Sequence, residues 1–199
     1  MADRPEYYDL RSDFWRRHFA IALDYDAYLA VSDPDKAKKW EVMAAKIPPL
    51  TSEQAARLQG HNRKLHVLFY SGVWCGDCVR QGPMLCTIAR ACGSAIDLRF
   101  IDREASAELK DELRILGAEK VPVAVFLSED FLEVGRFGDR LLTVYRRKAR
   151  RELGAVCDPG IVAPSIEEMA AEQEEWVCIF ERMLLMLRLS PLLRTRYGD

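Results

Sequence analysis

The feature that most constrains this chain is a pair of cysteines placed between an apolar run and a helix-like run. The pair lies in Val73-Trp74-Cys75-Gly76-Asp77-Cys78, near the middle of the 199 residues. The largely apolar run before it, residues 65–71, predicts a strand buried on both faces. The run after it, residues 76–91, predicts a helix that contains Pro83. A Cys-x-x-Cys pair where a strand passes into a helix is typical of thiol redox chemistry.

The positions of the two thiols predict different roles for them. Cys75 would lie at the start of the helix, where free N–H groups and partial positive charge lower the pKa of a thiol. Cys78 would lie one turn further on, more buried and facing the same way. We therefore expect Cys75 to attack a substrate disulfide and Cys78 to resolve the mixed disulfide. Asp77 is expected to raise the pKa of Cys75, and Arg80 to offset that effect.

Two other interpretations of the pair remain open from the residues alone. The pair could be half of a zinc site, which needs a second pair, but Cys86 and Cys92 have five residues between them and lie on a different helix face. The pair could also be two inert thiols, although Gly76-Asp77 between them is typical of a turn and fits a core poorly. We expect no metal and no cofactor. Plain buried thiols are expected at Cys86, Cys92, Cys157 and Cys178, and structural or surface histidines at His18, His61 and His66.

The composition argues against several other functions. A hydrophobic content of 49% and a charged content of 30% are typical of a globular protein. The net charge of -2 provides no basic surface for nucleic acid or an anionic membrane. Residues 1–6 lack the apolar segment of a signal peptide, and no apolar run reaches the roughly 18 residues of a membrane span. Six cysteines in such a chain indicate a reducing compartment, and we expect the cytoplasm.

The first 61 residues are expected to form a helical extension. Helical spacing predicts one helix over about 10–30, and Ser32-Asp33-Pro34 begins a second helix that ends near Lys46. Thr51 or Ser52 caps a third helix that ends near Gly60. Seven aromatic side chains lie within the first 28 residues. Because exposed aromatics at this density would aggregate, we expect the extension to be docked on the rest of the chain.

The centre of the chain alternates strand and helix patterns. Strands are expected over 65–71, 96–102, 121–127 and 131–137. Helices are expected over 76–91, 105–116 and 140–153. The first two strands should be parallel with a right-handed crossover, and a hairpin turning at 128–130 should close one edge of a mixed sheet.

The end of the chain predicts a Gly/Pro-rich link over 158–164 and a long helix. Ser165 and Glu168 form the pattern of a capping box, and the helix should stop at Ser190-Pro191. One stripe of the helix is apolar, and its second half is apolar nearly all round. We therefore expect burial by more than one neighbour, and residues 176–189 are a candidate homodimer surface.

With these residues in hand, the chain resembles the thioredoxin family. Trp74-Cys75-Gly76-Asp77-Cys78 is similar to the family's active-site signature, and Pro83 matches the proline in the active-site helix. Val121-Pro122 matches the cis-proline that faces the cysteines, and Gly135 or Gly138 resembles the glycine that lines the substrate groove. The resemblance covers roughly residues 62–152 and rests on three motifs in the right order.

The resemblance implies a nucleophile at Cys75 and a resolving cysteine at Cys78. It implies that an extended substrate segment hydrogen-bonds to the backbone at Val121 next to a cis Pro122. The implied substrate-binding set is Trp74, Gly76, Asp77, Val121 and Pro122. Two residues depart from the family pattern: Phe69 stands where a buried Asp often assists the resolving cysteine, and Asp77 replaces a common proline.

Together these observations predict an α/β thioredoxin fold, with a central mixed sheet flanked by helices and with helical extensions at both ends. The expected division is a helical extension over 1–61, a thioredoxin-like domain over 62–152, and a linker with a packed helix over 153–199. The expected function is thiol–disulfide exchange with a protein or small-molecule disulfide, and a reductase or thiol as electron donor. The rival hypothesis is a binding module, in which the extensions form the partner surface and the cysteines are regulatory or vestigial.

Overall fold

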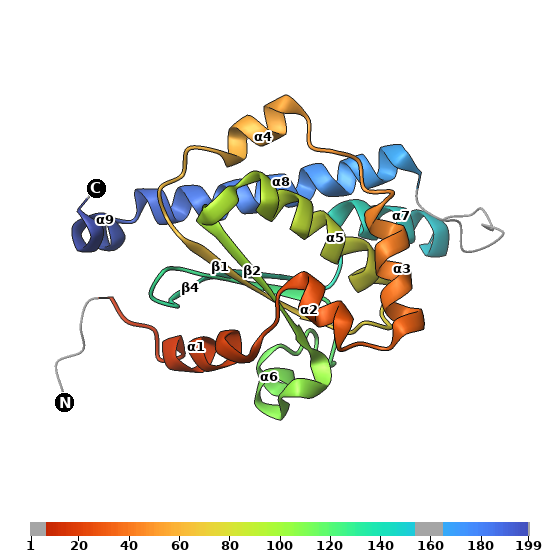
Figure 1. The fold of residues 1–199 in the computed structure, drawn as a ribbon, viewed down its shortest axis with the longest axis horizontal. Helices are drawn as coiled ribbons and strands as arrows, with labels where there is room; N and C mark the ends of the chain where they lie inside the picture. Colours follow the sequence, from red (N-terminus) through yellow and green to blue (C-terminus); the bar gives the residue numbers. More distant parts are fainter. Residues whose placement is uncertain (1–6, 154–164, 199) are drawn as a thin grey trace.

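A four-stranded mixed sheet lies at the centre of the chain (Figure 1). The computed structural model describes residues 7–153 and 165–198. The strands are β1 (Leu65–Ser71), β2 (Ile96–Asp102), β3 (Val123–Leu127) and β4 (Glu133–Gly138), in the order β2-β1-β3-β4. β1 is parallel to β2 and antiparallel to β3, and β3 is antiparallel to β4. The predicted mixed sheet with a hairpin at its edge is confirmed.

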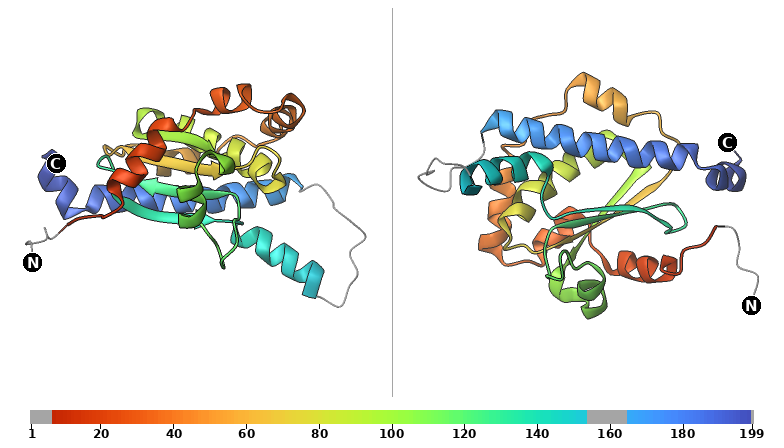
Figure 2. Two further views of the ribbon diagram at one scale, coloured as in Figure 1. Left: turned by 90° about the horizontal axis from the view of Figure 1, so that it is seen from below. Right: turned by 180° about the vertical axis from the view of Figure 1, so that it is seen from behind.

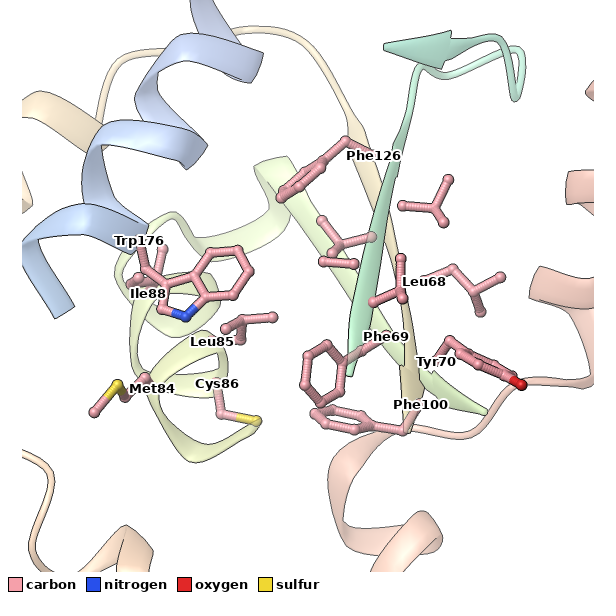
Figure 3. Close-up of a cluster of buried hydrophobic side chains, with 14 of the residues drawn as sticks. Leu68, Phe69, Tyr70, Met84, Leu85, Cys86, Ile88, Phe100, Phe126 and Trp176 are labelled. Carbon is pink, nitrogen blue, oxygen red and sulfur yellow. The ribbon is translucent and has the colours of Figure 1, made fainter. Parts of the chain in front are cut away.

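The central strand β1 is buried on both faces, as its apolar run predicts. Its side chains alternate: Figure 3 shows Phe69 directed toward the α5 side, and Leu68 and Tyr70 directed the other way. All three are completely buried. Phe69 meets Phe100 of β2 edge to face, with ring centroids 5.4 Å apart. Aromatic packing therefore occupies the position where the family resemblance would place an acid.

Helices cover both faces of the sheet (Figures 1 and 2). α5 (Gly76–Ala91) and α8 (Ile166–Leu189) lie on one face, where Phe126 of β3 packs on Phe180. α1 (Ser12–Ile21) lies on the other face, where Phe19 packs on His66. The remaining helices are α2 (Tyr25–Ala30), α3 (Pro34–Ala44), α4 (Ser52–Leu58), α6 (Ala107–Glu112), α7 (Leu142–Leu153) and α9 (Pro191–Tyr197), with short 3-10 turns η1 (Gly93–Ala95) and η2 (Arg103–Ala105).

The single helix expected over residues 10–30 is wrong, because the chain breaks into α1 and α2. Between them, Leu23 forms an antiparallel bridge with Phe100, with N···O distances of 2.9 and 2.6 Å. Asp24 then caps α2 by accepting a hydrogen bond from the Ala27 N–H at 2.8 Å. The helical spacing continues across the break, but pairing with the sheet edge interrupts the helix there.

The aromatic residues of the N-terminal helices are docked, as their density predicts. Trp15, Tyr28 and Trp40 are at most 2% exposed. Trp40 donates a buried hydrogen bond from Nε1 to the Val73 carbonyl at 2.9 Å, and therefore fastens α3 to the turn before the cysteines. Tyr7 and Tyr8, at the start of the described chain, are instead almost half exposed.

The long C-terminal helix α8 begins with the predicted capping box of Ser165 and Glu168. Its apolar stripe is buried, and the expectation of more than one neighbour is confirmed, because α4, α5, α7, β1 and β4 all contact the helix. Leu185, Met186 and Leu189, which lie off this stripe, are nevertheless 42%, 41% and 69% exposed. After the predicted stop, Ser190 caps the short helix α9, which the sequence interpretation missed. The predicted link at 158–164 lies outside the described residues.

The helices that flank β3 and β4 are shorter than predicted. The helix expected over 105–116 is limited to α6, which Ser106 caps, and the helix expected over 140–153 begins at Leu142. Within residues 7–153 and 165–198, no helix is long and apolar enough to cross a membrane.

Candidate active site

The cysteine pair lies where β1 gives way to α5. A turn after Ser71 returns the chain, and the Cys75 N–H donates to the Gly72 carbonyl at 2.9 Å. Cys75 is the N-cap residue of α5 and is partly exposed, whereas Cys78 is completely buried one turn later. Both are free thiols in this structure. The predicted strand–turn–helix placement of the pair is therefore observed.

The two thiols differ sharply in acidity. The pKa of Cys75 is lowered to about 7, chiefly because the Cys78 thiol hydrogen-bonds to its thiolate. Burial opposes this effect, while the backbone N–H groups of Cys78 and Asp77 add to it. The pKa of Cys78 is raised far above its ordinary value, chiefly by burial and then by its contact with Cys75. At neutral pH the first cysteine is therefore the readily ionised one.

Asp77 acts on Cys75 in the predicted direction, because its carboxylate raises the pKa of that thiol. Its charge is held by two arginines. Arg80 binds one carboxylate oxygen at 2.9 Å, as the sequence suggests, and Arg140 binds the other at 2.8 Å. The sequence interpretation missed Arg140, which comes from the segment between β4 and α7. This double pairing limits the effect of the carboxylate on the nucleophile.

The Val121–Pro122 peptide bond is cis, as predicted, and it lies beside Cys75. The Cys75 thiol donates to the Val121 carbonyl at 3.7 Å. Of the two glycines considered, Gly138 is the one at this place, because a Cβ there would lie 2.6 Å from the Pro122 carbonyl oxygen. Gly135 instead faces Met183 of α8. The sequence positions 75, 121, 122 and 138 are thus brought together.

The other predicted substrate-contacting residues border the pair. Trp74 is 51% exposed, and the Arg103 guanidinium lies 5.1 Å from its ring centroid. A Cβ on Gly76 would meet nothing within 4 Å, so the space over the start of α5 is open. Trp74 thus presents an exposed apolar surface next to the partly exposed Cys75.

Behind Arg80 lies an ion-pair network that the sequence interpretation missed. Arg80 binds Glu172 of α8 at 2.7 Å, and Arg147 of α7 binds the same carboxylate at 3.2 Å. The side chain of Glu172 is 1% exposed, and burial raises its pKa despite both arginines. A signal was available in the sequence, because Glu172 lies on the buried face of α8 between Met169 and Trp176.

Asp139 anchors the segment that follows Gly138. It is 3% exposed, accepts a hydrogen bond from the Tyr145 hydroxyl, and pairs with Lys120 and Arg140 at 3.4 Å. Its backbone carbonyl accepts from Gln81 of α5 at 3.1 Å. The sequence interpretation assigned Asp139 no role at the site. In the structure its contacts connect Gln81 of α5, Lys120 and Tyr145 of α7.

The remaining cysteines lie apart from the pair. Cys86 is buried as predicted, and Cys92 is partly buried. The expectation of burial is wrong for Cys178, which is exposed on the outer side of α8 beside Arg57. Cys157 lies outside the described residues. In the part of the chain that the structure describes, no three His, Cys, Asp or Glu side chains gather as metal ligands.

Comparison with known proteins agrees with this architecture. A sequence profile of the family described as Thioredoxin matches residues 22–145, which is more than half of the chain. A crystal structure of a protein of unknown function from Pseudomonas aeruginosa is similar, with a TM-score of 0.65 and 22% identity over 85% of this chain and 96% of that one. An HIV epitope-scaffold is similar with a TM-score of 0.57 and 21% identity over 92% and 98%. No curated protein matches the sequence.

Proposed function

The chain belongs to the thioredoxin family, and on that premise we propose that it is a thiol–disulfide oxidoreductase whose redox couple is Cys75 and Cys78. The observation that carries the proposal is the contrast between the two thiols. Cys75 is partly exposed with a pKa of about 7, whereas Cys78 is buried and its raised pKa keeps it protonated at neutral pH. A nucleophile needs the first environment and a resolving thiol tolerates the second.

The proposed reaction has two exchange steps. The Cys75 thiolate attacks one sulfur of a substrate disulfide, so that a mixed disulfide forms and the other substrate sulfur leaves as a thiol. Cys78 then loses its proton and attacks the Cys75 sulfur. The Cys75–Cys78 bond forms, the bond to the substrate breaks, and the departing thiolate takes up a proton. The substrate is reduced by two electrons, and a reductase or thiol donor must later reduce the pair.

The segment around the cis-proline is the proposed substrate contact. The Val121 carbonyl already accepts from Cys75, so an approaching backbone would meet a polar edge next to the reactive sulfur. Trp74 would supply apolar contact, and Gly76 and Asp77 would border the approach. Either a protein or a small-molecule disulfide fits this description.

Reduction of insulin disulfides with dithiothreitol as electron donor tests the proposal. Wild type should accelerate the reaction, and Cys75→Ser should abolish the acceleration because no nucleophile remains. Cys178→Ser is the matched control, since it removes an exposed thiol away from the pair and should leave the rate unchanged. No acceleration by wild type, or full acceleration by Cys75→Ser, would exclude the enzyme in favour of a binding module.

A binding role is the second candidate, and one observation favours it. A groove of about 1050 Å³ lies between the first described residues, β4 and the end of α8, and it is lined in part by Tyr8, Leu10, Met186 and Leu193. The homodimer predicted through residues 176–189 would use the exposed Leu185, Met186 and Leu189, since Trp176 and Phe180 are buried within the chain. Sedimentation of wild type and Leu189→Glu tests that dimer.

A further inference from the structure

Two buried hydroxyl groups next to Cys78 have no regular hydrogen bond. Ser71 is the last residue of β1 and is completely buried, and Tyr28 comes from α2 and is 2% exposed. Neither Ser71 Oγ nor the Tyr28 hydroxyl has a partner of normal hydrogen-bond geometry. Burying a hydroxyl without a partner is unfavourable. These two donors are therefore unsatisfied while Cys78 is an uncharged thiol.

The Ser71 hydroxyl links the other two groups. It lies close enough to both groups to lower the pKa of Cys78 and of Tyr28, although its single proton can serve only one of them at a time. Positions 69 and 71 of β1 point to the same face, and Figure 3 shows Phe69 on the α5 side. Ser71 therefore faces the helix that carries Cys78.

The Tyr28 hydroxyl is held in place by its ring. The ring stacks on Phe100 at 5.6 Å and meets Trp40 edge to face at 5.7 Å. Trp40 in turn is hydrogen-bonded to Val73, two residues before Cys75. The N-terminal helices thus deliver a fixed hydroxyl to the buried side of the cysteine site.

The resolving step needs a polar group next to the Cys78 sulfur. Cys78 must become a thiolate before it can attack the mixed disulfide, and its burial opposes that charge. The strongest influences on its pKa are burial, Cys75, the Gly72 backbone and Ser71, and no carboxylate is among them. Phe69 occupies the position of an assisting acid in the family resemblance, and it is completely buried.

We propose, on the basis of the proposed function, that Ser71 and Tyr28 stabilise the Cys78 thiolate during the resolving step. The Ser71 hydroxyl donates to the sulfur as its charge forms, and Tyr28 is a positioning residue that donates to Ser71 Oγ. Both hydroxyls keep their own protons. The proton from the Cys78 thiol passes to solvent, and the departing substrate thiolate takes up an equivalent proton, so the step is balanced.

Other charged groups around this site must be considered in any pH profile. The N-terminus of α5 carries Cys75, Asp77 and Arg80, the partner of Asp77. The segment between β4 and α7 carries Arg140. β2 carries Asp102, which lies opposite Ser71 in the sheet register. The charge of Asp102 raises the pKa of Tyr28. None of these groups is altered by removing a hydroxyl from Ser71 or Tyr28.

Stopped-flow reaction with 5,5′-dithiobis(2-nitrobenzoic acid) separates the two steps. With reagent below the protein concentration, attack by Cys75 releases one thionitrobenzoate, and resolution by Cys78 releases the second. The Cys178→Ser chain serves as the background so that its exposed thiol consumes no reagent, and the Cys75→Ser trace is subtracted.

Ser71→Ala should slow the second release by about tenfold and Tyr28→Phe by about threefold, as expected for lost hydrogen bonds to a charge. The first release should change by less than about twofold, and the pH profile of the second should move to higher pH. Tyr25→Phe is the matched control, because it removes another unpartnered buried hydroxyl from α2, one that lies near Cys86.

Unchanged rates and pH profiles of the second release in both variants would overturn the inference, as would equal slowing in Tyr25→Phe. If wild type itself shows no second release, Cys78 does not resolve and the proposed function fails with it. The two failures are thus distinguishable. Tyr28→Phe keeps the test valid even if Ser71→Ala does not fold.

Discussion

The N-terminal and C-terminal helices both reach the cysteine site, but through different chemistry. α2 and α3 approach from behind the pair with aromatic rings, one buried hydrogen bond and unpaired hydroxyls. α8 approaches through Glu172, whose carboxylate holds Arg80, which in turn holds Asp77 next to Cys75. One approach is almost free of charge, and the other is a chain of alternating charges.

This difference in charge predicts that the N-terminal helices affect Cys78 and that the C-terminal helix affects Cys75. An apolar environment with few dipoles keeps Cys78 protonated, so that side governs the resolving thiol. A charged network partly neutralises Asp77, so that side modulates the acidity of the nucleophile, which the Cys78 thiol chiefly sets. The comparison predicts that disturbing the apolar side costs mainly stability and that disturbing the charged side has effects that depend on pH.

Trp40→Ala should have the largest effect. It empties a completely buried indole site and removes the hydrogen bond to Val73, so the free energy of unfolding should decrease by about 3–5 kcal/mol. Urea unfolding followed by circular dichroism measures this change. Val42→Ala on the same helix is the control, since Val42 is 51% exposed and should change stability by less than about 0.5 kcal/mol. Equal effects would show that α3 is not anchored by its aromatic residue.

Arg80→Met should have the second-largest effect on the free energy of unfolding, and this effect should depend on pH. It leaves Glu172 buried with only the longer contact to Arg147, and an incompletely paired buried charge costs about 2–4 kcal/mol at neutral pH. The pKa of Glu172 is already raised by burial and should rise further without Arg80. The loss should therefore be full above the variant's folded-state pKa and absent below the wild-type folded-state pKa, where both folded proteins hold the proton.

Arg57→Met is the matched control for Arg80→Met. Arg57 also pairs with two glutamates of α8, Glu174 at 2.6 Å and Glu181 at 2.7 Å, but their side chains are 43% and 29% exposed. Pairs of that exposure contribute about 1 kcal/mol or less. Denaturant unfolding at several pH values should show a strong pH dependence for Arg80→Met alone. A pH-independent loss would contradict the role of Glu172.

Gly82→Ala tests whether the close approach of α3 to α5 is rigid. A Cβ at position 82 would clash with the Trp40 ring, which is held by its hydrogen bond. Overpacking of this kind costs about 1–3 kcal/mol, and the better helix propensity of Ala offsets up to about 1 kcal/mol of that loss. Gly135→Ala is the contrasting variant, because its Cβ would meet the end of the unbranched Met183 side chain, at 3.0 Å, and no ring or backbone atom. Thermal denaturation should therefore rank Gly82→Ala below Gly135→Ala in stability.

Much of the fold was predictable because its signals are local. The bounds of β1, β2 and α5 follow from apolar runs and from the residues that end them. The break between α1 and α2 was not predictable in this way, since it depends on pairing between Leu23 and Phe100, far apart in the sequence. The exposure of Leu185 and Leu189 likewise depends on which elements pack against α8, and the helix's own sequence does not encode that.

The candidate site was predictable where it rests on motifs and obscure where it rests on tertiary contacts. Cys75, Cys78 and the cis bond at Pro122 were identified from short patterns. Arg140, Glu172 and Tyr28 reach the pair from other elements, and no local spacing connects them to it. Phe69 gave a usable signal, because an apolar residue at that position means that any polar assistance to Cys78 must come from elsewhere.

The smallest effect is expected for Asp77→Asn, which acts on the charged side alone. The carboxylate raises the pKa of Cys75, so its removal should lower that pKa, and Arg80 and Arg140, which keep only Glu172 and Asp139 as partners, should act in the same direction. Because the pKa is about 7, the wild-type rate of attack on the dithiobis reagent should rise with pH through that value. The variant should react about twofold faster near pH 6 and no faster above about pH 8.5, where Cys75 is ionised in both proteins.

Asp111→Asn, which removes a carboxylate of α6 paired with Arg114, should leave that profile unchanged. Asp77 is not among the strongest influences on the pKa of Cys78, so Asp77→Asn should also leave the second, Cys78-dependent release close to the wild-type rate. The two rates therefore separate the roles of the two extensions. Removing a charge near Cys75 should alter the rate of attack, whereas removing a hydroxyl near Cys78 should alter the rate of resolution. If Asp77→Asn moves the midpoint of attack to higher pH, the arginines do not control the nucleophile and the division of roles is wrong.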